Sequence, residues 1–90
     1  MTIYRATLVC TGVPVSVEAE DAACIEEEFT NRPHHQNVQC ILVDGTLILT
    51  AENDYDRTGL ALMDEFSDVI MACISNGFDG DIEIRSVIVI

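Results

Sequence analysis

Two adjacent histidines are the strongest candidates for a reactive site in this sequence. His34 and His35 stand in the polar segment 33–37, and histidine is both a common metal ligand and the side chain that titrates near neutral pH. Adjacent side chains of an extended segment point to opposite sides, and no carboxylate or cysteine stands at a spacing typical of a metal site. We therefore expect a solvated polar loop here, with neither a bound metal nor a cofactor.

Pairs of carboxylates are a second candidate for cation binding or acid–base catalysis. Asp64 and Asp68 are four residues apart, and Asp79 and Asp81 flank Gly80. A calcium loop, however, needs alternating oxygen ligands that end in a bidentate glutamate. Neither pair has that pattern, so we interpret them as surface and helix-end groups, with a weak Mg²⁺ or Ca²⁺ site as the alternative.

Motifs for covalent catalysis or phosphate binding are absent from the sequence. It contains no GxSxG nucleophile motif, no cysteine in a motif with histidine, and no glycine-rich loop free of acidic residues. A loop that cradles phosphate offers backbone N–H groups and avoids carboxylates. We therefore predict that the protein is not an enzyme.

The charge of the chain restricts its partners. The 90 residues include 16 Asp and Glu but only 4 basic residues, all arginine, for a formal net charge of −12. Proteins bind nucleic acid by neutralising phosphates with Lys and Arg, and a strongly negative field repels anionic membranes as well. We predict no direct nucleic-acid or membrane partner, and instead a cation or a basic protein surface.

The cysteines and the N-terminal segment predict a cytoplasmic protein. The four cysteines have spacings that match no compact disulfide framework, and no CxxC pair occurs. We expect them to be reduced thiols that act as small hydrophobic residues. The first ten residues lack the basic and apolar regions of a signal peptide, and no apolar run approaches the roughly 20 residues of a membrane span. The cysteines are Cys10, Cys24, Cys40 and Cys73.

The periodicity predicts two helices. Residues 57–76 repeat apolar side chains at helical spacing, with Leu62, Phe66 and Val69 on one face and Asp64 and Asp68 on the other. Side-chain oxygens at 53–56 can cap the start of this helix, and Asn76–Gly77 can end it. Residues 21–31 form a shorter helix whose inward residues are Ala22, Ile25 and Phe29.

The remaining segments alternate as strands and predict an α+β two-layer sandwich. The predicted sheet is mostly antiparallel with both helices on one face, in a single domain of residues 1–90. Asp44–Gly45 between two apolar runs marks a hairpin. The order is ββαββαβ, or the ferredoxin-like βαββαβ if the first two strands are one. The expected strands are 3–10, 13–19, 38–43, 46–51 and 82–90.

The second face of such a sheet needs a partner. Val87 and Val89 are expected on that face, where a row of exposed valines is a liability in a monomer. We expect a homodimer or an apolar patch that binds another protein. A structural or regulatory subunit that binds its partner through this face is therefore one functional hypothesis.

The leading hypothesis places function on the acidic helices. In size, charge and lack of catalytic motif the chain resembles the small acidic inhibitors that phages and plasmids encode, such as anti-CRISPR proteins and DNA mimics. That resemblance implies a non-catalytic inhibitor that blocks a basic nucleic-acid-binding surface. The residues predicted to bind the partner are Glu27, Glu28, Asp64, Glu65 and Asp68.

Two alternatives stand beside this hypothesis. The acidity could serve solubility alone. A small dimeric α+β domain that binds a small molecule, or acts as an isomerase-like enzyme, would use His34 or His35 as its base. These alternatives predict different sensitive residues, because only the last one requires a histidine.

Overall fold

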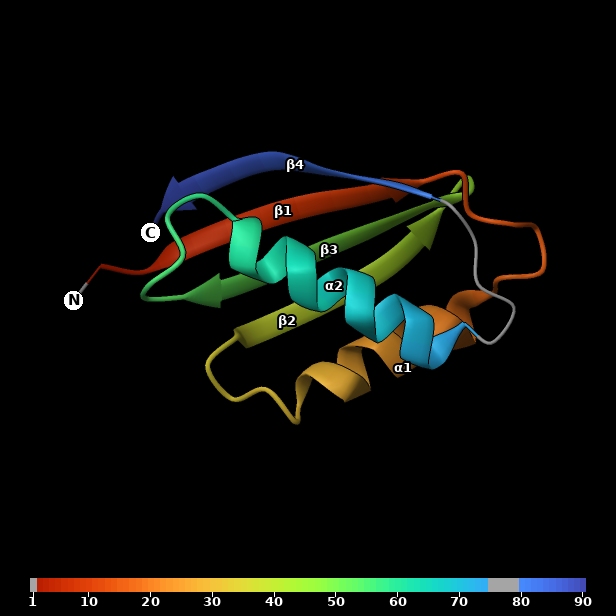
Figure 1. Cartoon of the computed structure of the whole chain (residues 1–90), viewed down its shortest axis with the longest axis horizontal. Helices are drawn as coiled ribbons and strands as arrows, with labels where there is room; N and C mark the ends of the chain where they lie inside the picture. The colour runs from red at the N-terminus through yellow and green to blue at the C-terminus, as the bar shows by residue number, and fades with distance from the viewer. Residues whose placement is uncertain (1, 75–79) are drawn as a thin grey trace.

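The chain folds into an α+β two-layer sandwich, as predicted. The computed structural model describes residues 2–74 and 80–90. Figure 1 shows both helices on one side of a four-stranded antiparallel sheet. The order is the ferredoxin-like βαββαβ, in which each helix connects two strands that lie on either side of a third. The elements are β1 (Tyr4–Thr11), α1 (Ala19–Phe29), β2 (Gln36–Val43), β3 (Thr46–Asn53), α2 (Leu60–Cys73) and β4 (Asp81–Val89).

The sheet has the strand order β2-β3-β1-β4, so β3 and β1 are its central strands. The predicted hairpin is confirmed: β2 and β3 pair from Val43 and Thr46 onwards. The two residues between them, Asp44 and Gly45, both have positive φ angles of 48° and 73°. That conformation matches the twist of a tight hairpin and is accessible to Asp and Gly at low cost.

The predicted strand at residues 13–19 is wrong. Val17 N–H donates to the Pro14 carbonyl oxygen at 3.0 Å, so this segment is a turn. Val13 and Val17 are buried on either side of the turn, while Val15 between them is fully exposed. The alternation of valines in this segment therefore does not indicate a strand. It belongs to a loop that buries Val13 and Val17 in the core and exposes Val15. The chain goes directly from β1 through this loop to α1, which selects the six-element order.

The core lies between the sheet and the two helices, and the predicted inward faces are confirmed. Ala22, Ile25 and Phe29 of α1 are buried. On α2 the buried residues are Leu62, Phe66, Val69 and Ile70. Across residues 2–74 and 80–90, no helix has the length and apolar character needed to cross a membrane.

The start of α2 is capped by a buried aspartate. Asp56 Oδ2 accepts the N–H of Leu62 at 3.1 Å, and its Oδ1 accepts the N–H of Gly59 at 3.0 Å. Gly59 has a φ of 81°, and a Cβ there would lie 3.2 Å from Ile84 on β4. The helix therefore begins at Leu60, three residues later than predicted, because a left-handed residue precedes it. The predicted end at 76–77 lies outside the described residues.

A disulfide joins the two helices, so the prediction of reduced thiols is wrong for Cys24 and Cys73. Their Cα atoms are 6.0 Å apart, which is a usual separation for a disulfide. Cys10 and Cys40 are free and buried, as expected. The pairing escaped prediction because the two cysteines are 49 positions apart in the chain.

The position predicted for Val87 is also wrong. A register shift in β1–β4 pairs Thr7 with Ser86 but Leu8 with Ile84. The bulge inserts one extra residue on β4 and turns Val87 toward the helices, where it packs against the core. Val89 is exposed, but it pairs with Tyr4, two residues before the partner of Val87, so it lies on the same face as Val87 and its predicted face is wrong too. The residues available for a homodimer or an apolar binding patch on the far face are therefore exposed residues such as Ile41 and Ile88.

Candidate functional site

The carboxylate of Glu65 lies at the centre of a group of nitrogen donors. Arg32 Nη1 lies 3.2 Å and His34 Nε2 lies 3.1 Å from its Oε1, and His35 Nε2 contacts its Oε2. The His35 side chain is completely buried, whereas 18% of the Glu65 side chain and 48% of the His34 side chain are exposed. We refer to His34, His35 and Glu65 as the histidine–glutamate cluster.

A turn after α1 brings the two histidines to the same side. The N–H of His35 donates to the carbonyl oxygen of Arg32 at 3.0 Å, which places Pro33 and His34 in the middle of the turn. The two imidazole rings are consequently 4.5 Å apart, and both present Nε2 to Glu65. The prediction of a solvated loop with opposed side chains is therefore wrong. Side chains alternate only where the backbone is extended, and here it is not.

Asn53 assigns the tautomer of His35. Its Oδ1 accepts the backbone N–H groups of Tyr55 at 3.2 Å and Asp56 at 2.7 Å, so its amide nitrogen must face the other way. That nitrogen lies 3.4 Å from His35 Nδ1. Because an amide nitrogen can only donate, Nδ1 is the acceptor and the neutral ring carries its hydrogen on Nε2. The Nε2–H group then donates to Glu65.

Glu65 is held as a carboxylate. Burial raises its pKa, but hydrogen bonds from His35 and His34, and the charge of these rings when they are protonated, outweigh burial, so the pKa lies below the ordinary value. A depressed carboxylate pKa stabilises the fold at any pH above the ordinary value, and this contribution disappears as the pH falls through the lowered pKa. The cluster therefore ties the turn after α1 to α2 at neutral pH and releases it in strong acid.

We expect Glu65→Gln to be destabilising at pH 7, because glutamine offers one neutral oxygen to three donors. The difference in free energy of unfolding between wild type and variant should shrink as the pH falls below about 4. Urea titrations of both proteins at pH 7 and at about pH 3, in EDTA, measure this difference. A difference that stays the same after acidification would contradict the carboxylate role of Glu65.

Two surface cavities adjoin the cluster. One of about 420 Å³ is lined by Glu27 and Phe29 of α1, by His35 and by Val38 of β2. A second of about 330 Å³ is lined by His34 together with polar residues that include Glu52 and Asp54. The cluster can thus be approached from solvent on the side of His34, while His35 faces the core.

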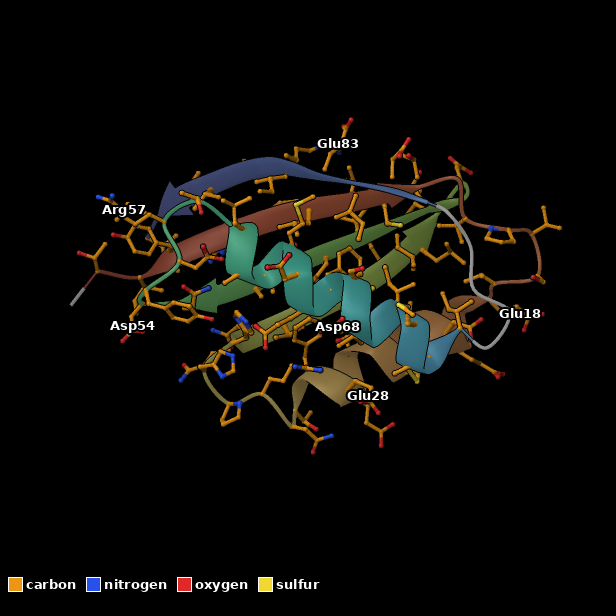
Figure 2. The ribbon with its side chains drawn as sticks, in the orientation of Figure 1. Glu18, Glu28, Asp54, Arg57, Asp68 and Glu83 are labelled. Atoms are coloured by element: carbon orange, nitrogen blue, oxygen red, sulfur yellow. A yellow bond between two sulfur atoms is a disulfide. The ribbon has the colours of Figure 1, made fainter. Side chains whose placement is uncertain are left out.

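The predicted partner-binding residues separate into two groups. Glu27 on α1 and Asp64 and Asp68 on α2 are exposed, and Glu28 is half-buried. Glu65 belongs to the histidine–glutamate cluster, so its carboxylate is already bonded. Figure 2 shows Glu28 and Asp68 on the helical side of the molecule, one on each helix. Four of the five residues therefore remain available on the surface of the helices.

Two covalent or ionic links align the helices. Cys24 is bonded to Cys73, and Arg32 is paired with Glu65. Along the chain, Glu28 lies between these two links, one helical turn after Cys24 and four residues before Arg32. The two links hold α1 and the turn that follows it against α2.

Sequence reasoning missed several residues of the site. Arg32, Asn53 and Tyr55 all contact the cluster, and the Tyr55 hydroxyl lies 3.4 Å from His35 Nε2. No local spacing links these residues to Glu65. Among the carboxylate pairs, Asp79 lies outside the described residues, and Asp64, Asp68 and Asp81 are exposed.

Comparisons with protein-family models, with curated proteins and with solved structures find no significant match to this chain.

Proposed function

We propose that the protein is a non-catalytic inhibitor that uses its acidic helices to block a basic nucleic-acid-binding surface of a partner complex. The observation that carries this proposal is the charge of the helical layer. Helix α1 contains five carboxylates and α2 contains three, and neither contains a lysine or arginine. Anions held in a fixed array can occupy a basic channel in place of phosphates.

The helical layer is pre-organised for such binding. The Cys24–Cys73 disulfide and the Arg32–Glu65 ion pair join α1 to α2, so their relative position is set before a partner is met. A surface that is rigid before binding loses less conformational entropy on association. We therefore assign Glu27, Glu28, Asp64 and Asp68 to direct contact and Glu65 to holding the helices together.

The test is a triple charge reversal, Glu27→Lys with Asp64→Lys and Asp68→Lys. All three residues are exposed, so the variant should fold with the circular dichroism spectrum of wild type. We expect it to lose the basic nucleic-acid-binding proteins that immobilised wild type retains from a nuclease-treated bacterial lysate at low salt. Mass spectrometry identifies the retained proteins, and added DNA or RNA should release them from the wild type.

A matched control separates the helical surface from net charge. Asp54→Lys with Asp81→Lys and Glu83→Lys makes the same change of charge at exposed positions outside the helices. Figure 2 places Glu83 on β4, away from both helices. This control should retain the same proteins as wild type. Equal loss in both triple variants would mean that net charge, and not the surface of the helices, drives retention, and no loss in either would mean that the acidity serves solubility alone.

The histidine–glutamate cluster favours a second candidate function, the binding or isomerisation of a small molecule. Glu65 holds Nε2 of His34, as a carboxylate orients the imidazole of a general base, and His34 also lines the second cavity. His34→Ala should leave partner capture unchanged under the inhibitor proposal. Loss of capture in that variant would indicate that function depends on the histidine–glutamate cluster.

The compartment is part of the same proposal. Reduced cysteines predict a cytoplasmic location, whereas the Cys24–Cys73 disulfide favours an oxidising environment. An inhibitor of a cytoplasmic complex would then need to form or keep this disulfide in the reducing cytoplasm. Protein isolated from the producing cell under alkylating conditions shows whether Cys24 and Cys73 form a disulfide in that compartment.

A further inference from the structure

We infer that the histidine–glutamate cluster is a binding site for a divalent transition-metal ion of the zinc class. His34, His35 and Glu65 each offer one ligand atom, and these atoms all lie within 4.8 Å of one another. Zinc bonds of 2.0–2.2 Å in a tetrahedral site require ligand atoms about 3.4 Å apart. His34 Nε2 lies 3.1 Å and 3.3 Å from the two Glu65 oxygens. This inference is independent of the proposed inhibitor function.

The donor set selects the kind of ion. Two imidazole nitrogens and one carboxylate oxygen suit Zn²⁺, Co²⁺ and Ni²⁺, whereas Ca²⁺ and Mg²⁺ prefer sites made of oxygen alone. Three protein ligands leave a fourth position open, as in zinc sites that also bind water or a substrate. The half-exposed His34 gives an ion access from solvent, and the net charge of −12 raises the concentration of cations around the protein.

Neighbouring groups both support and weaken the site. Arg32 donates to Oε1 of Glu65, which leaves Oε2 beside His35 for the ion and orients the carboxylate. Asn53 has the opposite effect, because its amide nitrogen favours the tautomer with hydrogen on His35 Nε2. A metal needs the lone pair of His35 Nε2, so the hydrogen of the ring must move to Nδ1. The Nδ1–H group then lies beside the N–H donors of the Asn53 amide, which is unfavourable.

The opposing effect of Asn53 can be tested with a variant that should raise the affinity for Zn²⁺. Asn53→Asp keeps an oxygen for the N–H groups of Tyr55 and Asp56 and adds a second oxygen that accepts a hydrogen from His35 Nδ1. Carboxylate partners of metal-binding histidines change affinity by 10–100-fold. We expect this variant to bind Zn²⁺ at least about tenfold more tightly than wild type. Gln36→Glu, an exposed position beside His34, adds the same charge without facing Nδ1 and should change affinity much less.

The experiment is isothermal titration of ZnCl₂ into the full chain after EDTA treatment and buffer exchange, with excess Mg²⁺ to occupy surface carboxylates. We expect one tight Zn²⁺ site per chain, weakened at least about tenfold by His34→Ala and by Glu65→Gln. The free thiols of Cys10 and Cys40 are buried and should not contribute. His35→Ala is avoided as a primary variant, because its side chain is completely buried.

Nitrogen NMR of the histidine rings provides a readout that does not depend on affinity. Bound Zn²⁺ should shift Nε2 of both histidines and move the His35 hydrogen to Nδ1. Absence of Zn²⁺ binding in excess Mg²⁺ would overturn the inference. Binding that is unaffected by both His34→Ala and Glu65→Gln, or spectra in which the histidines do not change, would do the same.

Discussion

Loss of the Cys24–Cys73 disulfide is expected to lower the free energy of unfolding by about 4 kcal/mol. The bond closes a loop between residues 49 positions apart, and the chain-entropy relation gives about that value for a loop of this length. It also joins α1 to α2, which together cover one face of the sheet. Urea denaturation of oxidised protein, reduced protein and the double variant Cys24→Ser with Cys73→Ser measures the loss.

The two remaining thiols make the oxidation state easy to verify. Burial raises the pKa of Cys40 to about 12, with smaller contributions from the charges of Glu26 and Cys10, and burial raises the pKa of Cys10 as well. Neither thiol should react with iodoacetamide in the folded protein at neutral pH. Native protein should remain unmodified, and mild reduction should expose only Cys24 and Cys73. Reduced protein that is as stable as oxidised protein would contradict the prediction.

Asp56→Ala is expected to destabilise the protein by about 2–4 kcal/mol. Asp56 is buried, with only 6% of the residue exposed, and its two carboxylate oxygens accept the N–H groups of Gly59 and Leu62. Alanine leaves both donors buried without a partner, and each such donor costs about 1–3 kcal/mol. The loss should appear as an earlier midpoint with an unchanged slope in urea titrations.

Two further variants provide the controls for this prediction. Asp54→Ala removes a neighbouring carboxylate that is exposed, and it should change stability by less than about 0.5 kcal/mol. Asp56→Asn keeps one oxygen acceptor and should lose only part of the stability. Equal stability of the Asp56→Ala and Asp54→Ala proteins would show that the cap does not stabilise α2.

Much of the fold could be predicted because it follows from local rules. Periodic apolar residues indicated the inward faces of both helices, and Asp44–Gly45 indicated the hairpin, since each signal involves residues within one or two turns of each other. The same rules failed at residues 13–19, where the valines alternate as in a strand but the segment forms a turn closed by the Pro14 carbonyl oxygen. They also missed the bulge on β4, because register depends on the partner strand.

Composition alone established the acidity of the chain, but not what each carboxylate does. Glu65 and Asp68 are on the same helix, yet Glu65 is enclosed by Arg32, His34 and His35 while Asp68 is exposed. The partners of Glu65 stand about 30 positions earlier in the chain and reach it only because α1 and α2 pack side by side on the sheet. The net charge is the sum of the residue charges and can be read from the sequence. Which carboxylates take part in a site depends on how α1 and α2 pack in the folded structure.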